Sequence, residues 1–103
     1  MTTEEKFQGV WLENCKKMEE LGIPAARMTR SIGELGALSA ARRLLSRRRN
    51  SDGFALLAQR ERLDLSLEAL VVQSRFGGLF TDAEADFCLQ SLLEAGYYGS
   101  AGA

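Results

Sequence analysis

The sequence predicts an all-α protein, a compact bundle of five or six short helices around a single core. Apolar residues recur at steps of three and four positions along most of the chain, which is the period of an amphipathic helix. Glycines and capping residues divide this pattern into short segments. Only one segment alternates as a strand would, and the rest of the chain offers it no convincing partner strand.

The composition is typical of one globular domain. The chain has 103 residues, of which 46% are apolar and 26% are charged, so it can bury a core without a metal ion or a disulfide. We expect one helical domain over residues 1–98 and a flexible tail over residues 99–103. No apolar run approaches the roughly 20 residues of a membrane span, and the acidic N-terminus does not resemble a signal peptide. We therefore expect a soluble, cytoplasmic protein that does not contact a membrane.

The first helix is expected to begin at Thr2 or Thr3 and to end before Gly22. Either threonine can cap the helix, and the two glutamates that follow suit the positive end of the helix dipole. The predicted inward face consists of Phe7, Val10, Trp11, Cys15, Met18 and Leu21.

Pro24 is well placed as the first residue of a second helix, because its missing N–H is not needed there. This helix is expected to end at Leu35, before Gly36. Met28, Ile32 and Leu35 form its predicted inward edge.

The third helix is expected over about residues 37–47 and contains an arginine-rich stretch, ARRLLSRRRN. Arg43 and Arg47 lie opposite the apolar side, and Arg42 flanks it. The next two arginines would turn back toward the apolar side, so the helix should end before them. Basic residues in a last turn also stabilise the negative end of a helix dipole, which gives this cluster a purely structural explanation. The predicted apolar side consists of Leu38, Ala41, Leu44 and Leu45.

A short fourth helix is expected within SDGFALLAQRER, with Asn50 or Ser51 as its cap. Phe54 and Leu57 should face inward, and Ala58 is a further candidate.

The segment LDLSLEALVVQ alternates leucines as in a strand, but we interpret it as a helix. Asp64 or Ser66 can cap a helix that carries Leu67, Leu70 and Val71.

A break at Gly77 and Gly78 is expected to separate this segment from a last helix that ends at Gly96. Thr81 and Glu84 have the spacing of a capping box at its start. Its expected inward residues are Phe87, Cys88 and Leu92, with Leu89 as a further candidate.

The chain lacks the usual components of a catalytic or metal site. It has no histidine, which removes the commonest general base and the commonest metal ligand. Its two cysteines lie among apolar residues at helical spacing and are expected to be reduced packing residues. Two pairs of acids with i, i+4 spacing, Asp64 with Glu68 and Asp82 with Asp86, are explained by helix dipoles more simply than by a cation. We expect no catalytic residue, no cofactor, no metal and no enzymatic activity.

Charge is distributed unevenly along the chain. Residues 1–24 carry a net charge of −2, residues 25–62 carry +6 and residues 63–103 carry −5. The basic segment can pair with the acidic segments of the same chain, bind nucleic acid, or bind an acidic protein. The overall charge of −1 and the lack of aromatic residues among the arginines weaken the second alternative. The candidate contact residues are Arg42, Arg43, Arg47, Arg48 and Arg49.

About residues 24–97 resemble a small helical module found in many uncharacterised bacterial proteins, alone or at the C-terminal end of larger chains. The resemblance is carried by the motifs GALSAARRLL, SDGF, RLDLSLEALV, LFTDAE and AGY. It implies a helical fold and no particular activity. One departure is Ala58, which occupies a position where the resemblance implies an aromatic residue, so part of the core should be less filled.

The expected function is that of a non-enzymatic accessory or protein-interaction module of a bacterial or phage system, with a protein partner of unknown identity. The alternative is a nucleic-acid-binding module that uses the arginine cluster. Trp11, Tyr97 and Tyr98 are consistent with either core positions or interface anchors. The sequence does not predict an oligomeric state.

Overall fold

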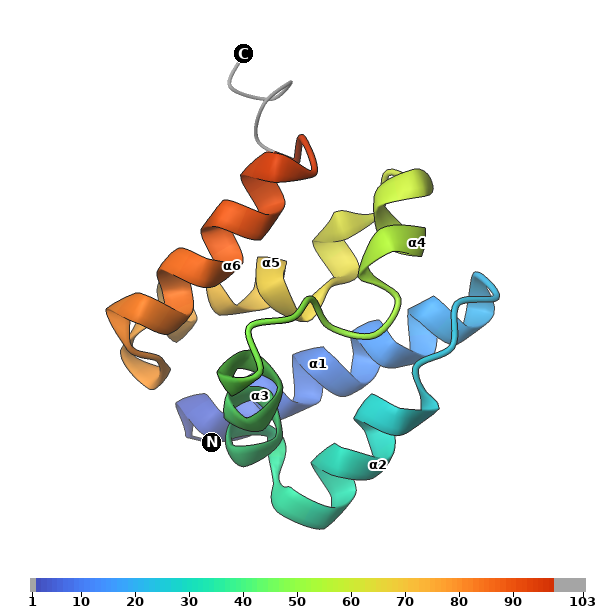
Figure 1. The fold of residues 1–103 in the computed structure, drawn as a ribbon. Helices are drawn as coiled ribbons and strands as arrows, with labels where there is room; N and C mark the ends of the chain where they lie inside the picture. Colours follow the sequence, from blue (N-terminus) through green and yellow to red (C-terminus); the bar gives the residue numbers. More distant parts are fainter. Residues whose placement is uncertain (1, 98–103) are drawn as a thin grey trace.

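Six α-helices and two 3-10 helices enclose one core in the computed structural model, which describes residues 2–97 (Figure 1). No strand occurs within that range, so the all-α prediction is confirmed. The radius of gyration is 12.7 Å, close to the roughly 13 Å of a globular domain of 100 residues. The predicted tail, residues 99–103, lies outside the described residues. The elements are α1 (Thr3–Glu20), α2 (Ala26–Leu35), α3 (Ala37–Ser46), α4 (Phe54–Gln59), η1 (Leu63–Leu65), α5 (Leu67–Val71), η2 (Ser74–Leu79) and α6 (Asp82–Glu94).

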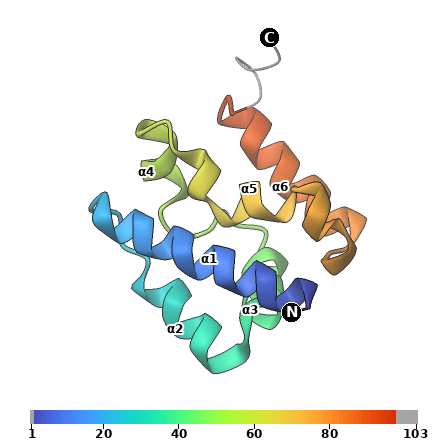
Figure 2. The same ribbon diagram turned by 180° about the vertical axis from the view of Figure 1, so that it is seen from behind.

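The first helix, α1, is the element around which most of the others pack. It crosses one face of the molecule and contacts α2, α3, α5 and both 3-10 helices (Figure 2). The predicted start is confirmed, since Thr2 and Glu5 form a capping box. The Phe7 ring lies 5.3 Å, centroid to centroid, from the rings of Phe76 and Phe80. This aromatic contact fastens η2 to α1 and places Gly77 and Gly78 inside a 3-10 helix rather than in a break.

The second helix begins two residues later than predicted. Ala25 is its N-cap, and Pro24 lies before the helix. The Ala25 N–H donates a hydrogen bond to Glu19 Oε2 at 2.8 Å, which holds this part of the chain outside the helix. The prediction that Leu35 is buried is also wrong. Leu35 is 41% exposed because it is the last residue of α2, where the chain turns away at Gly36.

Small residues form most of the inward face of α3. Ala37, Ala40 and Ala41 are buried with Leu45, whereas Leu38 and Leu44 are only partly buried. The N-terminus of α3 is held by α1, because the Ala37 N–H donates a hydrogen bond to Gln8 Oε1 at 3.2 Å. Alanine side chains allow the close approach of α3 to its neighbours and leave the opposite side of α3 to the arginines.

The fourth helix starts differently from its prediction. Its N-cap is Gly53, with a φ of 80°, and no side chain caps it. Neither Asn50 nor Ser51 serves as the cap, because Ser51 is hydrogen-bonded elsewhere. The predicted inward positions of Phe54 and Leu57 are confirmed.

The last two helices begin where their capping residues predict. The Ser66 Oγ accepts a hydrogen bond from the Ala69 N–H and begins α5, while the preceding leucines form the 3-10 helix η1. Thr81 and Glu84 form the predicted capping box of α6. Leu89, a candidate inward residue, is instead 40% exposed. Within residues 2–97, no helix has both the length and the apolar character needed to cross a membrane.

Candidate interaction surface

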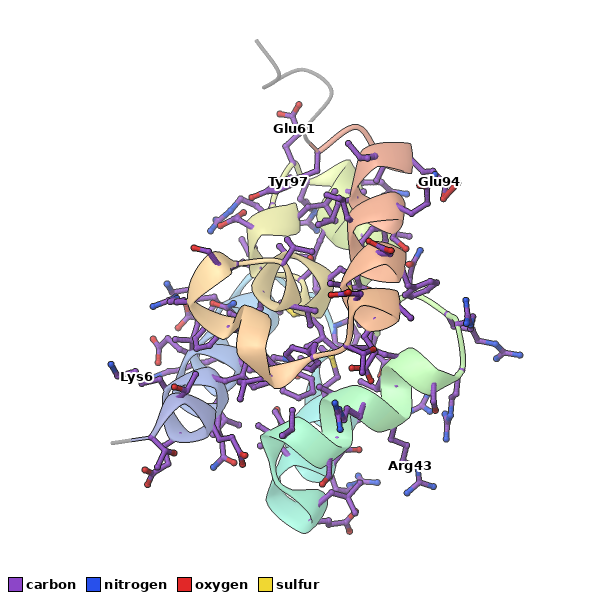
Figure 3. All side chains as sticks on the ribbon, turned by 90° about the vertical axis from the view of Figure 1, so that its left-hand side faces the viewer. Lys6, Arg43, Glu61, Glu94 and Tyr97 are labelled. Carbon is purple, nitrogen blue, oxygen red and sulfur yellow. The ribbon has the colours of Figure 1, made fainter. Side chains whose placement is uncertain are left out.

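The arginines predicted as contact residues are all exposed, but they divide between two sides of α3. Arg42 points toward α6 and forms an ion pair with Glu84, with 3.5 Å between Nε and Oε2. Arg43 and Arg47 line a hollow between α2 and α3 instead. Figure 3 shows the Arg43 side chain projecting from α3 away from the body of the molecule. The sequence cluster is therefore not one contact patch.

The hollow between α2 and α3 has a volume of about 300 Å³ and is lined by four arginines. We call it the basic groove and define it by Arg27 and Arg30 from α2, Arg43 from α3, and Arg47, the C-cap residue at which the loop after α3 begins. The sequence prediction missed the two arginines of α2. In the sequence, the only indication was that the two arginines lie on either side of the inward residue Met28. They reach the groove because α2 packs against α3.

The positive charge of the basic groove is only partly compensated. Arg27 Nε lies 3.8 Å from Asp52 Oδ2, but the Arg27 side chain is 79% exposed, so this pair contributes little to stability. Within residues 2–97, Arg30, Arg43 and Arg47 form no ion pair and no hydrogen bond through their side chains. These three guanidinium groups remain available to an external anion.

The floor of the basic groove is apolar, and its rim also carries acids. Met28 and Ala40 are buried beneath it, and Leu44 is partly buried. Glu34 and Asp52 line it together with the arginines. The groove therefore presents cations above an apolar base, interrupted by two carboxylates.

Two further arginines lie in the loop between α3 and α4. Arg48 and Arg49 are exposed and, within the described part of the chain, form no ion pair. Arg48 has a φ of 54°, the left-handed conformation that residues other than glycine seldom adopt. The loop then turns inward, and Ser51 is only 6% exposed. The same loop thus joins the arginine cluster to the core.

Glu68 on α5 receives this loop inside the core. Its side chain is fully buried, and its carboxylate accepts hydrogen bonds from Ser51 at 2.7 Å (backbone N) and 2.6 Å (Oγ). Burial raises the pKa of the Glu68 carboxyl, and the hydrogen bonds from Ser51 oppose that rise without cancelling it. Burial, assisted by the negative charges of Glu68 and Glu84, also raises the pKa of the Cys88 thiol to about 12.

Glu68 lies in the first turn of α5, as the helix-dipole interpretation expects, but it is buried and bound to Ser51, which that interpretation did not predict. Asp64 is exposed and forms an ion pair with Arg62, with 3.1 Å between Nε and Oδ1. The position of Glu68 within the apolar run LSLEALVV was the available sign that this residue is buried. The sequence gives no sign that its partner is Ser51.

A second hollow, also about 300 Å³ in volume, lies between the end of α4 and the end of α6. It is lined by Ala58, Glu61 and Tyr97, among others, and Figure 3 shows Glu61 and Tyr97 at the same end of the molecule. Ala58, where we expected a less filled part of the core, is partly buried at the edge of this hollow. Tyr97 is partly buried against the core and Trp11 is fully part of it, whereas Tyr98 lies outside the described residues.

The remaining acids and thiols do not assemble into a reactive site in the described residues. Asp82 and Asp86 are both exposed, and residues 2–97 contain no group of three or more acidic or cysteine side chains able to hold a metal ion. Cys15 and Cys88 are buried and form no disulfide. Every buried polar side-chain atom in the same range has a hydrogen-bond partner.

A comparison of the chain with known protein families, with curated proteins and with solved structures found no match. The resemblance to a helical module of bacterial proteins accordingly stays a prediction.

Proposed function

We propose that this chain is a non-enzymatic interaction module that binds an acidic face of a protein partner through the basic groove and the adjoining Arg48 and Arg49. We expect it to act in the cytoplasm of a bacterial or phage system. The observation that carries the proposal is the set of three uncompensated guanidinium groups, those of Arg30, Arg43 and Arg47, around an apolar floor. Guanidinium groups bind carboxylates in defined geometry, and an apolar floor adds contact area for a side chain of the partner.

Two features favour a protein partner over nucleic acid. Glu34 and Asp52 line the groove, and carboxylates at these positions repel a phosphate backbone. No aromatic side chain lines the groove, so bases have no platform on which to stack. A protein surface can place its own cations against Glu34 and Asp52 and its carboxylates against the arginines.

The experiment compares two double variants with the same change in charge. R43Q/R47Q removes two cations from the groove, and K16Q/K17Q removes two exposed cations from α1. These lysines lie outside the groove and form no ion pair within the part of the chain that the structure describes. A fluorescent peptide of ten glutamates serves as a defined acidic probe, and its binding is followed by fluorescence anisotropy at low salt. Because exposed ion pairs contribute about 0.2 to 1 kcal/mol each, R43Q/R47Q should weaken binding by about twofold to thirtyfold.

The control variant K16Q/K17Q should lose much less affinity for the peptide. Equal losses in the two double variants would show that the peptide responds to net charge and not to the groove, and they would refute the proposal.

Nucleic acid is the second candidate, because Arg43, Arg47, Arg48 and Arg49 are exposed and form no ion pair with any residue of the range 2–97. Four phosphate contacts would give a slope of about −3 to −4 for log affinity against log salt. We expect duplex DNA to bind no more tightly than the roughly 10⁻⁴ to 10⁻⁶ M of non-specific contact at physiological salt. Submicromolar binding with that slope, abolished by substitution of Arg47, Arg48 and Arg49 with glutamine, would replace the first candidate by the second.

A further inference from the structure

The loop that carries Arg48 and Arg49 contacts three different parts of the fold at three successive residues. Ser51 is bound by Glu68 of α5, and Asp52 pairs with Arg27 of α2. Gly53 packs against the end of α1 and the joint that follows it. Figure 1 shows this connection running across the middle of the molecule, between α3 and α4. The loop is therefore attached to the core immediately after its arginines.

Glu68 is the least expected of these attachments, because a buried carboxylate is costly. Replacement of buried charged groups by apolar side chains is often neutral or stabilising, and Glu68 lies between buried leucines on α5. Within the described residues, both hydrogen bonds to its side-chain oxygens come from Ser51, at 2.7 and 2.6 Å. Short hydrogen bonds to a carboxylate are stronger than neutral ones and restrict geometry more closely. The hydrogen bonds of the Glu68 side chain therefore hold the loop to α5.

The chain between α3 and Ser51 is too short to adjust freely. Helix α3 ends at Ser46, and only residues 47–50 connect it to Ser51. One of these, Arg48, is in the left-handed conformation, which costs about 1 to 2 kcal/mol for a residue with a side chain. If Ser51 were released, Arg48 could relax to an ordinary conformation, and the three arginines of the loop would change direction.

We propose that Glu68 is a positioning residue for the basic surface: through its two hydrogen bonds from Ser51 it sets where Arg47, Arg48 and Arg49 stand beside the basic groove. We call this pair of hydrogen bonds the loop anchor. The expected effect of the loop anchor on binding rests on the proposed function. Its expected effect on structure, which is to hold the loop against the core, does not.

The binding test compares E68A with E68Q, which change the net charge equally. In E68Q the amide oxygen can accept from the Ser51 N–H, and the amide nitrogen can donate to the Ser51 Oγ, so the loop anchor is kept. In E68A it is lost. Electrostatics alone predicts that both variants bind the ten-glutamate peptide at least as tightly as the native chain, because each loses a negative charge.

The proposal predicts a different result. E68Q should bind at least as tightly as the native chain, whereas E68A should bind more weakly, by up to about thirtyfold if the contributions of two arginines are lost. Equal affinities of E68A and E68Q, with native far-UV circular dichroism in both, would overturn the positioning role. Failure of the proposed function has another signature, namely equal losses in R43Q/R47Q and K16Q/K17Q.

A second measurement needs no ligand and keeps the inference testable if E68A does not fold. S51A removes only the hydrogen bond from the Ser51 Oγ and leaves the charge unchanged, and S39A is its control on the exposed surface of α3. Limited trypsin digestion reports opening of the loop, because trypsin cleaves after arginine and residues 47–49 are consecutive arginines. We expect faster cleavage at these residues in S51A than in S39A or E68Q. Cleavage of S51A at the same rate as S39A would overturn the proposal.

Discussion

Substitution of Gly53 by alanine should be among the most damaging small changes in this protein. Gly53 has a φ of 80°, and a Cβ built on it would lie 2.7 Å from both Ile23 Cγ2 and Met18 Cε. The Met18 methyl is the end of a flexible side chain, but Ile23 Cγ2 can move only if the buried, β-branched Ile23 side chain changes its χ1 rotamer or the backbone shifts. Both neighbours are buried, at 1% exposure, so neither has free space to enter.

The expected loss in the free energy of unfolding of G53A has two parts, and a control variant separates them. The left-handed conformation costs alanine about 1 to 2 kcal/mol, and overpacking in a core costs about 1 to 3 kcal/mol, so G53A should lower the free energy of unfolding by about 2 to 5 kcal/mol. Gly22 has a φ of 82° with no atom within 4 Å of an added Cβ, so G22A should lose only the first part. The reduced entropy of the unfolded chain affects both variants alike and cancels in the comparison.

The measurement is urea denaturation of both variants and the native chain, followed by far-UV circular dichroism. A loss in G53A no larger than that in G22A would refute the packing of the loop against the end of α1.

Two further predictions concern the core and its buried carboxylate. Leu45→Ala should cost about 2 to 5 kcal/mol and Phe54→Ala about 3 to 5 kcal/mol in the same urea assay, because both side chains are buried, whereas Arg43→Ala should stay within about 0.5 kcal/mol. If Arg43→Ala proves the most damaging of the three, the inward face of α3 is wrongly assigned. The raised pKa of Glu68 predicts that stability relative to the non-titrating E68Q is greatest below pH 4.5 and is lost as pH rises through the folded pKa. A relative stability that instead grows with pH would mean that the Ser51 hydrogen bonds outweigh burial.

The sequence predicted those features whose cause lies within a few residues. The capping box of Thr81 and Glu84 and the cap at Ser66 start their helices because donors and acceptors three residues apart satisfy each other locally. The prediction for Pro24 failed for the opposite reason. The residue after it is bound by Glu19, six positions before Ala25, and that tertiary hydrogen bond overrides the local preference of proline.

The candidate site was predictable only in part, because most of it is assembled by packing. Arg43 and Arg47 could be identified as exposed from helical periodicity alone. The arginines of α2 join them only because α2 and α3 lie against each other. The bond between Ser51 and Glu68 spans 17 positions, and nothing in either local sequence specifies that distance.

The uneven charge of the chain is largely left unpaired by the fold, which is the strongest argument for a partner. Residues 25–62 carry +6 and residues 63–103 carry −5, so complete internal pairing was an open alternative. Within the described residues, two ion pairs join these two segments. Arg42 with Glu84 is about half exposed on the arginine side, and Arg62 with Asp64 connects residues only two positions apart at the boundary. The third ion pair, Arg27 with Asp52, lies inside the basic segment. Most of the positive charge therefore faces outward over the basic groove and its loop, where an acidic partner can neutralise it.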